Sequence, residues 1–299
     1  APAEARVEAP CEVFTVCGGC PWQSASQALQ RDTRRQNVVT RLQPFIGPET
    51  RMHGWVGPEA SEGYRTRALM VTRHRGGSLR MGFYAAGTQD LVPIETCPVQ
   101  HPRVNSVLTH AHRILARLDW PTWRSAKRPG VLRGLLFRVD PSRDEGILTL
   151  ILSVDPGPKV AAAAEHLIRI EGVCGVHVNV NARESGPLLG PRTLHLKGKR
   201  RQTIRYGTLE LEVSPSAFVQ TRHDMAEAMV ETLGSFLPQK IEHLVDLYAG
   251  AGLLGLSFRE RAERVTLIES HPAASADALH NASRLGGEGQ IEVFAEDAA

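Results

Sequence analysis

Three cysteines lie within ten residues near the start of the chain, at Cys11, Cys17 and Cys20, in a sequence that contains five. Because disulfides are not expected in a cytoplasmic protein, this spacing indicates metal ligation. Cys97 is the best candidate for a fourth ligand, since a cysteine followed by proline recurs in iron–sulfur ligation. Four thiolates suit a [4Fe–4S] cluster or a structural zinc, and the spacing leaves both open. Cys174 lies in an alternating strand-like run and is expected in the core.

A glycine turn near the other end of the chain forms a second candidate site. An apolar run over residues 244–247 is followed by Gly250 and Gly252, and then by an apolar, helix-compatible segment over 253–261. Glycines let the backbone approach a ligand, and a helix N-terminus presents unpaired N–H groups. This strand–turn–helix pattern predicts a nucleotide-shaped site.

Carboxylates follow the next two apolar runs, as an adenosine site requires. Glu269 ends the run over 265–268, where a carboxylate usually binds the hydroxyls of a ribose. Asp297 follows the run over 291–294, where an acid can reach the amine of adenine. The pattern therefore predicts an adenosine-containing cofactor.

The identity of that cofactor depends on residues around the turn. The turn formally satisfies the G-x-G-x-x-G pattern of nicotinamide enzymes, but a lone match of this kind is weak. Asp246, four residues before Gly250, favours S-adenosylmethionine instead. So does the position of the turn, late in the chain and behind a predicted helix that carries Phe218 and Gln220.

Apolar periodicity predicts the elements that must position these sites. A new helical pattern starts near Ser214, because Ser214 or Ser216 can cap a helix that continues to Phe236. Upstream of it, the patterns predict helices over 24–42, 101–119 and 160–170, and strands within 54–95 and over 132–139, 146–154 and 173–181.

The predicted fold is α/β, with a Rossmann-like domain for S-adenosylmethionine, incomplete at its C-terminus, after a central α+β domain and a cysteine module. We expect the cysteine module at residues 1–50 and 90–100, the central RNA-contacting domain at 51–213 and the Rossmann-like part at 214–299. The sequence contains no apolar run that approaches the ~18 residues needed to cross a membrane. The expected protein is a cytoplasmic monomer.

The distribution of charge suggests a nucleic-acid partner. Residues 1–238 carry 30 Lys and Arg against 22 Asp and Glu, whereas residues 239–299 carry 5 against 10. A basic segment before an acidic segment that carries the cofactor motifs is typical of an enzyme that acts on RNA. A solvated surface is an alternative explanation for the excess of basic residues. Arginines that alternate with aromatic residues could bind phosphates and bases, or could form one exposed sheet face. These candidate RNA-binding residues are Arg65, Arg67, Arg73 and Arg75.

The ordered motifs CGGC, TCP, SPSAFVQ, DLYAGAG, LIES and FAED resemble the RNA (uracil-C5) methyltransferase family over about residues 11–299. The match is to its iron–sulfur branch, which resembles 23S rRNA 5-methyluridine methyltransferases. The resemblance implies a [4Fe–4S] cluster on Cys11, Cys17, Cys20 and Cys97, which decides against zinc. It also implies an RNA substrate and contacts to S-adenosylmethionine from Gln220, Tyr248, Gly250, Gly252, Glu269 and Asp297.

Several positions depart from the family pattern. Arg222 replaces the usual Asn of F-x-Q-x-N, and Leu285 replaces an Asn after the second motif. Family chemistry needs a cysteine that adds to uracil C6 and a base that removes the C5 proton. None of the five cysteines fits the first role, so no catalytic residue is assigned in this chain and both are expected beyond Ala299. The alternative hypothesis is a non-catalytic iron–sulfur RNA-binding protein with a relic cofactor fold.

Overall fold

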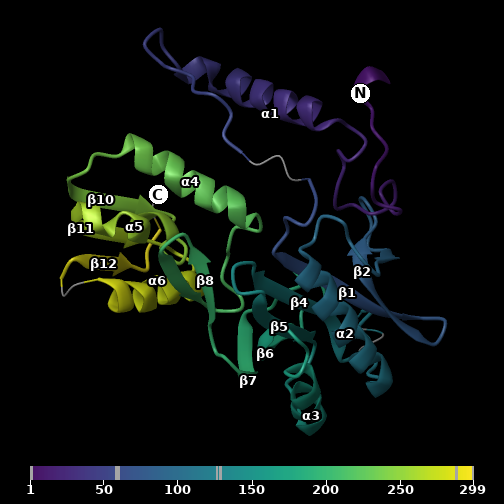
Figure 1. Ribbon diagram of the computed structural model, residues 1–299. Coiled ribbons are helices and arrows are strands. Elements are labelled where there is room, and N and C mark those ends of the chain that lie inside the picture. Colours follow the sequence, from purple (N-terminus) through teal and green to yellow (C-terminus); the bar gives the residue numbers. More distant parts are fainter. Residues whose placement is uncertain (1–2, 58–60, 126, 128–129, 287–288, 298–299) are drawn as a thin grey trace.

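A seven-stranded sheet occupies the middle of the chain, in the order β3-β2-β1-β4-β5-β6-β7 (Figure 1). The computed structural model describes residues 3–57, 61–125, 127, 130–286 and 289–297. All neighbouring strands are antiparallel except β5 and β6, which are parallel. The strands are β1 (Arg67–Arg75), β2 (Ser78–Tyr84), β3 (Leu91–Pro93), β4 (Leu132–Asp140), β5 (Glu145–Leu152), β6 (Val173–Val180) and β7 (Arg192–Gly198).

Helices α2 (Pro102–Leu118) and α3 (Pro158–Leu167) cover one face of this sheet. Each buries an apolar stripe, with Leu108 at 1% and Leu167 at 0% exposure, against strand residues such as Phe137. Burying such a side chain fully stabilises the fold by about 1.5–3 kcal/mol. This face is the main hydrophobic core of the upstream part of the chain.

The opposite face of the sheet carries buried polar side chains. Thr149 and His177 are paired across β5 and β6, and Asn179 lies two residues further along β6. All three are at most 2% exposed. The amide of Asn179 donates to the Gly190 carbonyl and to Thr193 Oγ1 at 2.9 Å each. This polar layer is therefore enclosed by the chain itself, which no periodicity in the sequence indicated.

His177 is expected to make the fold sensitive to acid. Burial lowers its pKa to about 4, against about 6.5 in an unfolded chain. Between these values the unfolded state binds a proton that the folded state does not. The free energy of unfolding should therefore fall as the pH falls from 6.5 to 4, by about 3 kcal/mol from this residue.

Urea denaturation at pH 7 and pH 4 checks this expectation. The H177Q variant should lose that part of the pH dependence, whereas H110Q, which changes an exposed histidine of α2, should keep it. An unchanged pH dependence in H177Q would show that this histidine titrates normally in the folded chain.

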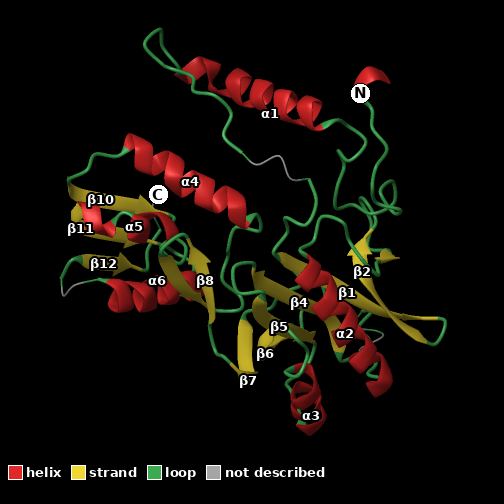
Figure 2. Ribbon diagram, viewed as in Figure 1, coloured by secondary structure: helices red, strands yellow, loops and turns green. Residues whose placement is uncertain are grey.

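A second, parallel sheet lies toward the C-terminal end, beside a two-stranded hairpin (Figure 2). Its order is β10-β11-β12, and helices flank it, so the predicted α/β class is confirmed at this level. Among the described strands β10 pairs only with β11, and its Val245 and Leu247 are 47% and 49% exposed. The elements are β8 (Gln202–Tyr206), β9 (Leu209–Val213), α4 (His223–Phe236), β10 (Ile241–Leu247), α5 (Leu253–Ser257), β11 (Ala262–Ile268), α6 (Pro272–Leu285) and β12 (Ile291–Phe294).

Helix α1 (Gln27–Leu42) stands apart from both sheets (Figure 1). It begins after Ser26, whose hydroxyl caps the helix by accepting from Leu29 N at 3.3 Å. None of its residues is buried. Short 3-10 turns occur at Ala3–Ala5, Gln43–Phe45 and Arg259–Arg261. Each helix in the described part of the chain is too short or too polar to span a membrane.

The helix predicted from Ser214 or Ser216 was wrong at its start. Helix α4 begins only at His223, and residues 214–222 are irregular. Tertiary hydrogen bonds hold this segment: its Ser214 carbonyl accepts from Arg138, and its Thr221 carbonyl accepts from Thr66 N at 2.9 Å. Those carbonyls cannot also serve a helix, so contacts distant in sequence override the local capping signal.

Candidate functional site

The glycine turn between β10 and α5 bends through three left-handed residues. Tyr248, Gly250 and Gly252 have φ values of 58°, 59° and 93°. A left-handed conformation is strained for an aromatic residue, and such strain is concentrated at functional sites. Tyr248 is also 69% exposed. At Gly252 a Cβ atom would come within 2.7 Å of Leu256 Cδ1, so glycine is required there by both conformation and space.

Three polar side chains hold this turn in place. Asp246 accepts from Gly255 N at 2.8 Å, and Glu269 accepts from Gly250 N at 2.9 Å. Asn281 on α6 is 0% exposed and donates to the Ala251 carbonyl at 3.1 Å. Burial, followed by the nearby charge of Glu269, raises the pKa of Asp246. The turn is thus fixed from β10, β11 and α6 at once.

An open cavity of about 150 Å³ lies against the turn. Two walls come from segments that the sequence separates by about thirty residues, the glycine turn and the loop before α4. A third comes from the β8–β9 hairpin. The lining residues are Tyr206, Leu211, Val213, Phe218, Val219, Gln220, Met229, Asp246, Leu247, Tyr248, Ala249, Gly250, Ala251, Leu253 and Leu254.

The structure brings only part of the predicted cofactor set into this cavity. Gln220, Tyr248 and Gly250 line it, and Gly252 caps α5 beside it. Glu269 follows β11 at the same edge of the parallel sheet, but its carboxylate accepts from Gly250 N and from His271 N. Asp297 follows β12 and is exposed outside the cavity lining.

Sequence reasoning missed the hairpin wall and Met229. Burial raises the pKa of the Tyr206 phenol in this wall to about 12, so the hydroxyl is neutral at physiological pH. Nothing in the sequence indicated that the β8–β9 hairpin packs against the glycine turn. That placement depends on tertiary contacts.

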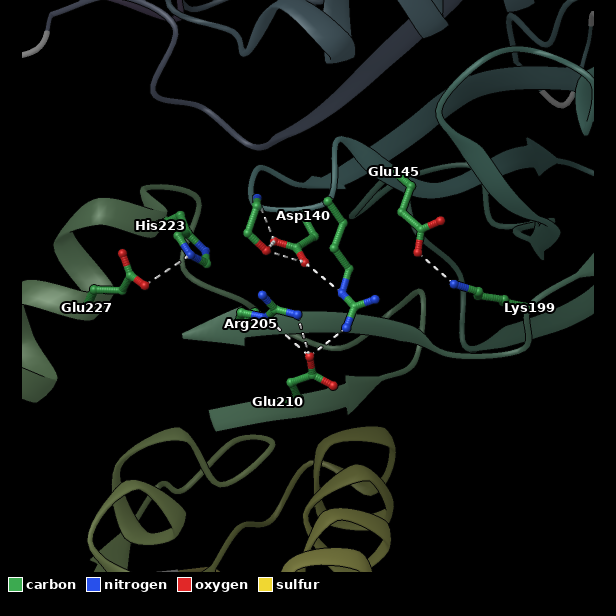
Figure 3. Close-up of polar contacts among 9 residues, drawn as sticks. Asp140, Glu145, Lys199, Arg205, Glu210, His223 and Glu227 are labelled. Atoms are coloured by element: carbon green, nitrogen blue, oxygen red, sulfur yellow. Dashed lines mark hydrogen bonds and ion pairs between the residues drawn. The ribbon is translucent and has the colours of Figure 1, made fainter. Parts of the chain in front are cut away.

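Charged residues attach the hairpin to the central sheet (Figure 3). Glu210 on β9 accepts from Arg205 on β8 and from Arg143, and Arg143 also pairs with Asp140 at the end of β4. On the other side of the hairpin, Asn281 bonds both the N–H and the carbonyl of Glu212. The hairpin is therefore held between the central sheet and α6.

Arg138 links the central sheet to the loop that carries Phe218 and Gln220. Its guanidinium, 2% exposed, donates to Gln202 Oε1 at 2.8 Å. It also donates to the carbonyls of Ser214 and Ala217 at 2.9 and 3.0 Å. Burial lowers the pKa of Arg138 to about 10. This buried cation thus positions one wall of the cavity.

The four predicted metal ligands, Cys11, Cys17, Cys20 and Cys97, line a second, small cavity together with Arg65. Burial raises the pKa of Cys20 and of Cys97, while the Arg65 guanidinium opposes the shift at Cys20. By contrast, the described residues contain no group of three or more His, Cys, Asp or Glu placed to hold one metal ion.

Cys174 lies outside this cavity and is only partly buried, rather than fully within the core as expected. Its thiol donates to the Gly146 carbonyl at 3.2 Å, and burial raises its pKa to about 11.

The four candidate RNA-binding arginines do not share one environment. Arg65 lies at the cysteine cavity, and burial lowers the pKa of the half-buried Arg67. Arg73 donates to Tyr84 Oη at 3.2 Å, and Arg75 is exposed beside the Gly76–Gly77 turn. Because β1 has nine residues, Arg67 and Arg75 lie about 27 Å apart.

The curated proteins similar in sequence to this chain are named RNA methyltransferases. No protein-family model matches it. It is 31% identical over 289 residues to a Thermosynechococcus vestitus protein named "uncharacterized RNA methyltransferase", covering 95% of the chain and 64% of that protein. An Enterococcus faecalis protein of the same name is 30% identical over 292 residues, covering 95% and 63%. The chain thus spans somewhat less than two thirds of these curated relatives.

The fold has a clear counterpart among solved structures. A tRNA (uracil-54, C5)-methyltransferase of Pyrococcus abyssi, in complex with S-adenosyl-L-homocysteine, matches with a TM-score of 0.72 at 19% identity. The match covers 98% of this chain and 66% of that protein. The chain therefore has the mixed α/β fold of an S-adenosylmethionine-dependent methyltransferase and is similar in sequence to bacterial proteins named RNA methyltransferases.

Proposed function

We propose that this chain provides the cofactor-binding part of an RNA methyltransferase that transfers a methyl group from S-adenosylmethionine to C5 of a uridine, in 23S rRNA. The observation that carries the proposal is the cavity in which Gln220 and Phe218 face the turn at Tyr248 and Gly250. The similar proteins named RNA methyltransferases and the matching fold support it.

The cavity suits the nucleoside of the methyl donor. Its open glycine turn lets the backbone approach the ligand, and Glu269 and Asp297 follow neighbouring parallel strands whose ends meet at this edge. Bound S-adenosylmethionine supplies an electrophilic methyl group. The residues of this chain would bind and orient the donor, and we assign neither the nucleophile nor the base of the reaction to them.

Calorimetric titration with S-adenosylhomocysteine tests the cofactor assignment. The chain should bind it and should not bind NAD. Q220A should weaken binding about tenfold, the equivalent of 1.4 kcal/mol, because an amide that faces the cavity is lost. Q239A removes an exposed glutamine elsewhere and should bind like the parent chain. Tight binding of NAD, or no binding of S-adenosylhomocysteine, would contradict the assignment.

Catalysis is tested with the full-length protein and a 23S rRNA transcript. Mass spectrometry of the digested RNA should detect 5-methyluridine when S-adenosylmethionine is present. The competing possibility, a non-catalytic RNA-binding protein with an iron–sulfur module, predicts RNA binding without consumption of S-adenosylmethionine.

We further propose that Cys11, Cys17, Cys20 and Cys97 hold a [4Fe–4S] cluster. The residues fit this group, because four thiols line one cavity and the Arg65 cation stands beside them to offset thiolate charge. The burial that raises the pKa of Cys20 and Cys97 also excludes water from such a cluster. Its place beside Phe83 of β2 favours a structural role, since it would join the N-terminal loop to the segment at Cys97.

A further inference from the structure

An open groove of about 570 Å³ runs between the cysteine loop, the start of α1 and the segment before β1. It is distinct from the cavity at the glycine turn, called the cofactor cavity from here on, because the two share no lining residue. Its walls combine aromatic rings, guanidinium groups and side-chain amides. Side chains of these three kinds include Trp22, Gln30, Arg34, Tyr64, Arg65 and Arg222.

The aromatic side chains form stacking surfaces in this groove. Trp22 is 40% exposed. The Arg222 guanidinium lies 4.5 Å from the ring centroid of Tyr64, and Asp224 accepts from Arg222 Nε at 3.1 Å. A planar, oriented guanidinium on an aromatic ring is a surface on which an unpaired base can stack. Arg222 occupies the position where the resemblance leads one to expect Asn.

The groove also carries cations that suit phosphate groups. Arg34 and Arg65 line it, against the carboxylates of Glu8 and Glu62. Arg34 is exposed and has no ion pair within the described residues. The ion pair on this helix joins Arg31 to Asp32 at 3.8 Å. The Arg34 guanidinium is therefore available to a phosphate in the groove.

The groove is joined to the cofactor cavity by residues 220–222, which hydrogen bonds hold in place. Gln220 lines the cavity and Arg222 lines the groove, so their Cα atoms are at most about 7 Å apart. Thr66 N and Thr66 Oγ1 both donate to the Thr221 carbonyl between them, at 2.9 and 3.2 Å. A strand of RNA in the groove is thus within about one nucleotide of the cofactor cavity.

We propose that this groove binds a single-stranded segment of the RNA substrate next to the target uridine. Bases would stack on Trp22 and on the Tyr64–Arg222 pair, while Arg34 and Arg65 would contact phosphates. The aromatic surfaces favour unpaired RNA over a duplex, whose bases are already stacked. That the bound RNA is the substrate rests on the proposed function, whereas RNA binding by the groove is tested separately.

Fluorescence anisotropy with a 5′-labelled, uridine-containing 12-nucleotide RNA tests the groove. W22A should weaken binding about tenfold, as expected for one lost stacking partner. R34A should weaken it and make it less dependent on salt, since one phosphate contact is lost. Affinity for S-adenosylhomocysteine should stay unchanged in both variants, which also shows that they are folded.

Matched variants on the same chain provide the controls. W55A changes another exposed tryptophan, and R35A changes the arginine next to Arg34 on α1; neither residue lines the groove. Equal RNA affinity in W22A, R34A and these controls would overturn the proposal. So would tighter binding of the same sequence as a duplex, or binding to anionic vesicles that competes with RNA. If the chain binds this RNA as described but no S-adenosylhomocysteine, the proposed function fails and the groove remains an RNA site.

Discussion

Replacement of Arg138 by methionine is expected to lower the free energy of unfolding by about 3 kcal/mol and to weaken binding of S-adenosylhomocysteine. The guanidinium is buried and makes three hydrogen bonds, to Gln202, Ser214 and Ala217. Charge-assisted bonds of this kind contribute about 1.5–3 kcal/mol each, and relief of the burial cost offsets part of their loss. Methionine fills similar space but leaves three acceptors without a donor.

The effect on cofactor binding follows from the loop that Arg138 holds. Ser214 and Ala217 precede Phe218 and Gln220, which line the cofactor cavity. Without the guanidinium this segment has one fewer anchor on the central sheet, so binding must include the cost of ordering it. The loss of affinity should therefore appear even at temperatures where R138M is fully folded.

Urea denaturation gives the change in stability, and calorimetric titration of the folded variant gives the change in affinity. R143M is the matched control, because Arg143 bridges the same sheet and hairpin through Asp140 and Glu210 but is exposed. Its urea midpoint should stay close to that of the parent chain. Full stability and affinity in R138M would show that the loop is positioned by other contacts.

Replacement of Cys97 by serine is expected to abolish iron incorporation. Cys97 lines the same cavity as the three clustered cysteines, although it lies about eighty residues away in the sequence. A cluster with three thiolates and an open side is labile, and its binding free energy is also folding free energy. Under the proposed cluster assignment, the parent chain should be brown, and the C97S protein should be colourless and more sensitive to urea.

Iron and acid-labile sulfide per chain, after anaerobic purification, give the measurement. C174S is the control, because Cys174 is the one cysteine outside the cavity and should leave the iron content unchanged. Zinc in place of iron in the parent chain would overturn the cluster and favour a structural zinc. Full iron content in C97S would exclude Cys97 as a ligand.

Local patterns in the sequence predicted most elements. The strands β1 and β2 within residues 54–95, the apolar stripe of α2 and the strand before the glycine turn all lie where periodicity places them. Such features depend on backbone conformation and on which face of an element is apolar. Both properties are local, so they can be read without knowledge of the partner element.

The prediction failed where a distant residue decides the local structure. The helix start near Ser214 is a strong capping signal, yet Arg138 and Asp277 occupy the polar groups that the cap would use. The sequence also contained no sign that Glu269, predicted to bind a ribose, accepts from the backbone N–H groups of Gly250 and His271. Hydrogen bonds between residues far apart compete with local ones, and the sequence gives no measure of that competition.

The sequence by itself determined which kinds of chemistry to expect: four thiols predict a metal, a glycine turn predicts a nucleotide and arginines predict RNA. Only the tertiary structure decided which residues meet. It placed the Phe218–Gln220 segment and the β8–β9 hairpin against the turn, and it brought Tyr64 and Arg222 together in a groove beside it. The physical reason is that residue type fixes what a side chain can bind, whereas packing between elements distant in sequence fixes where it can bind.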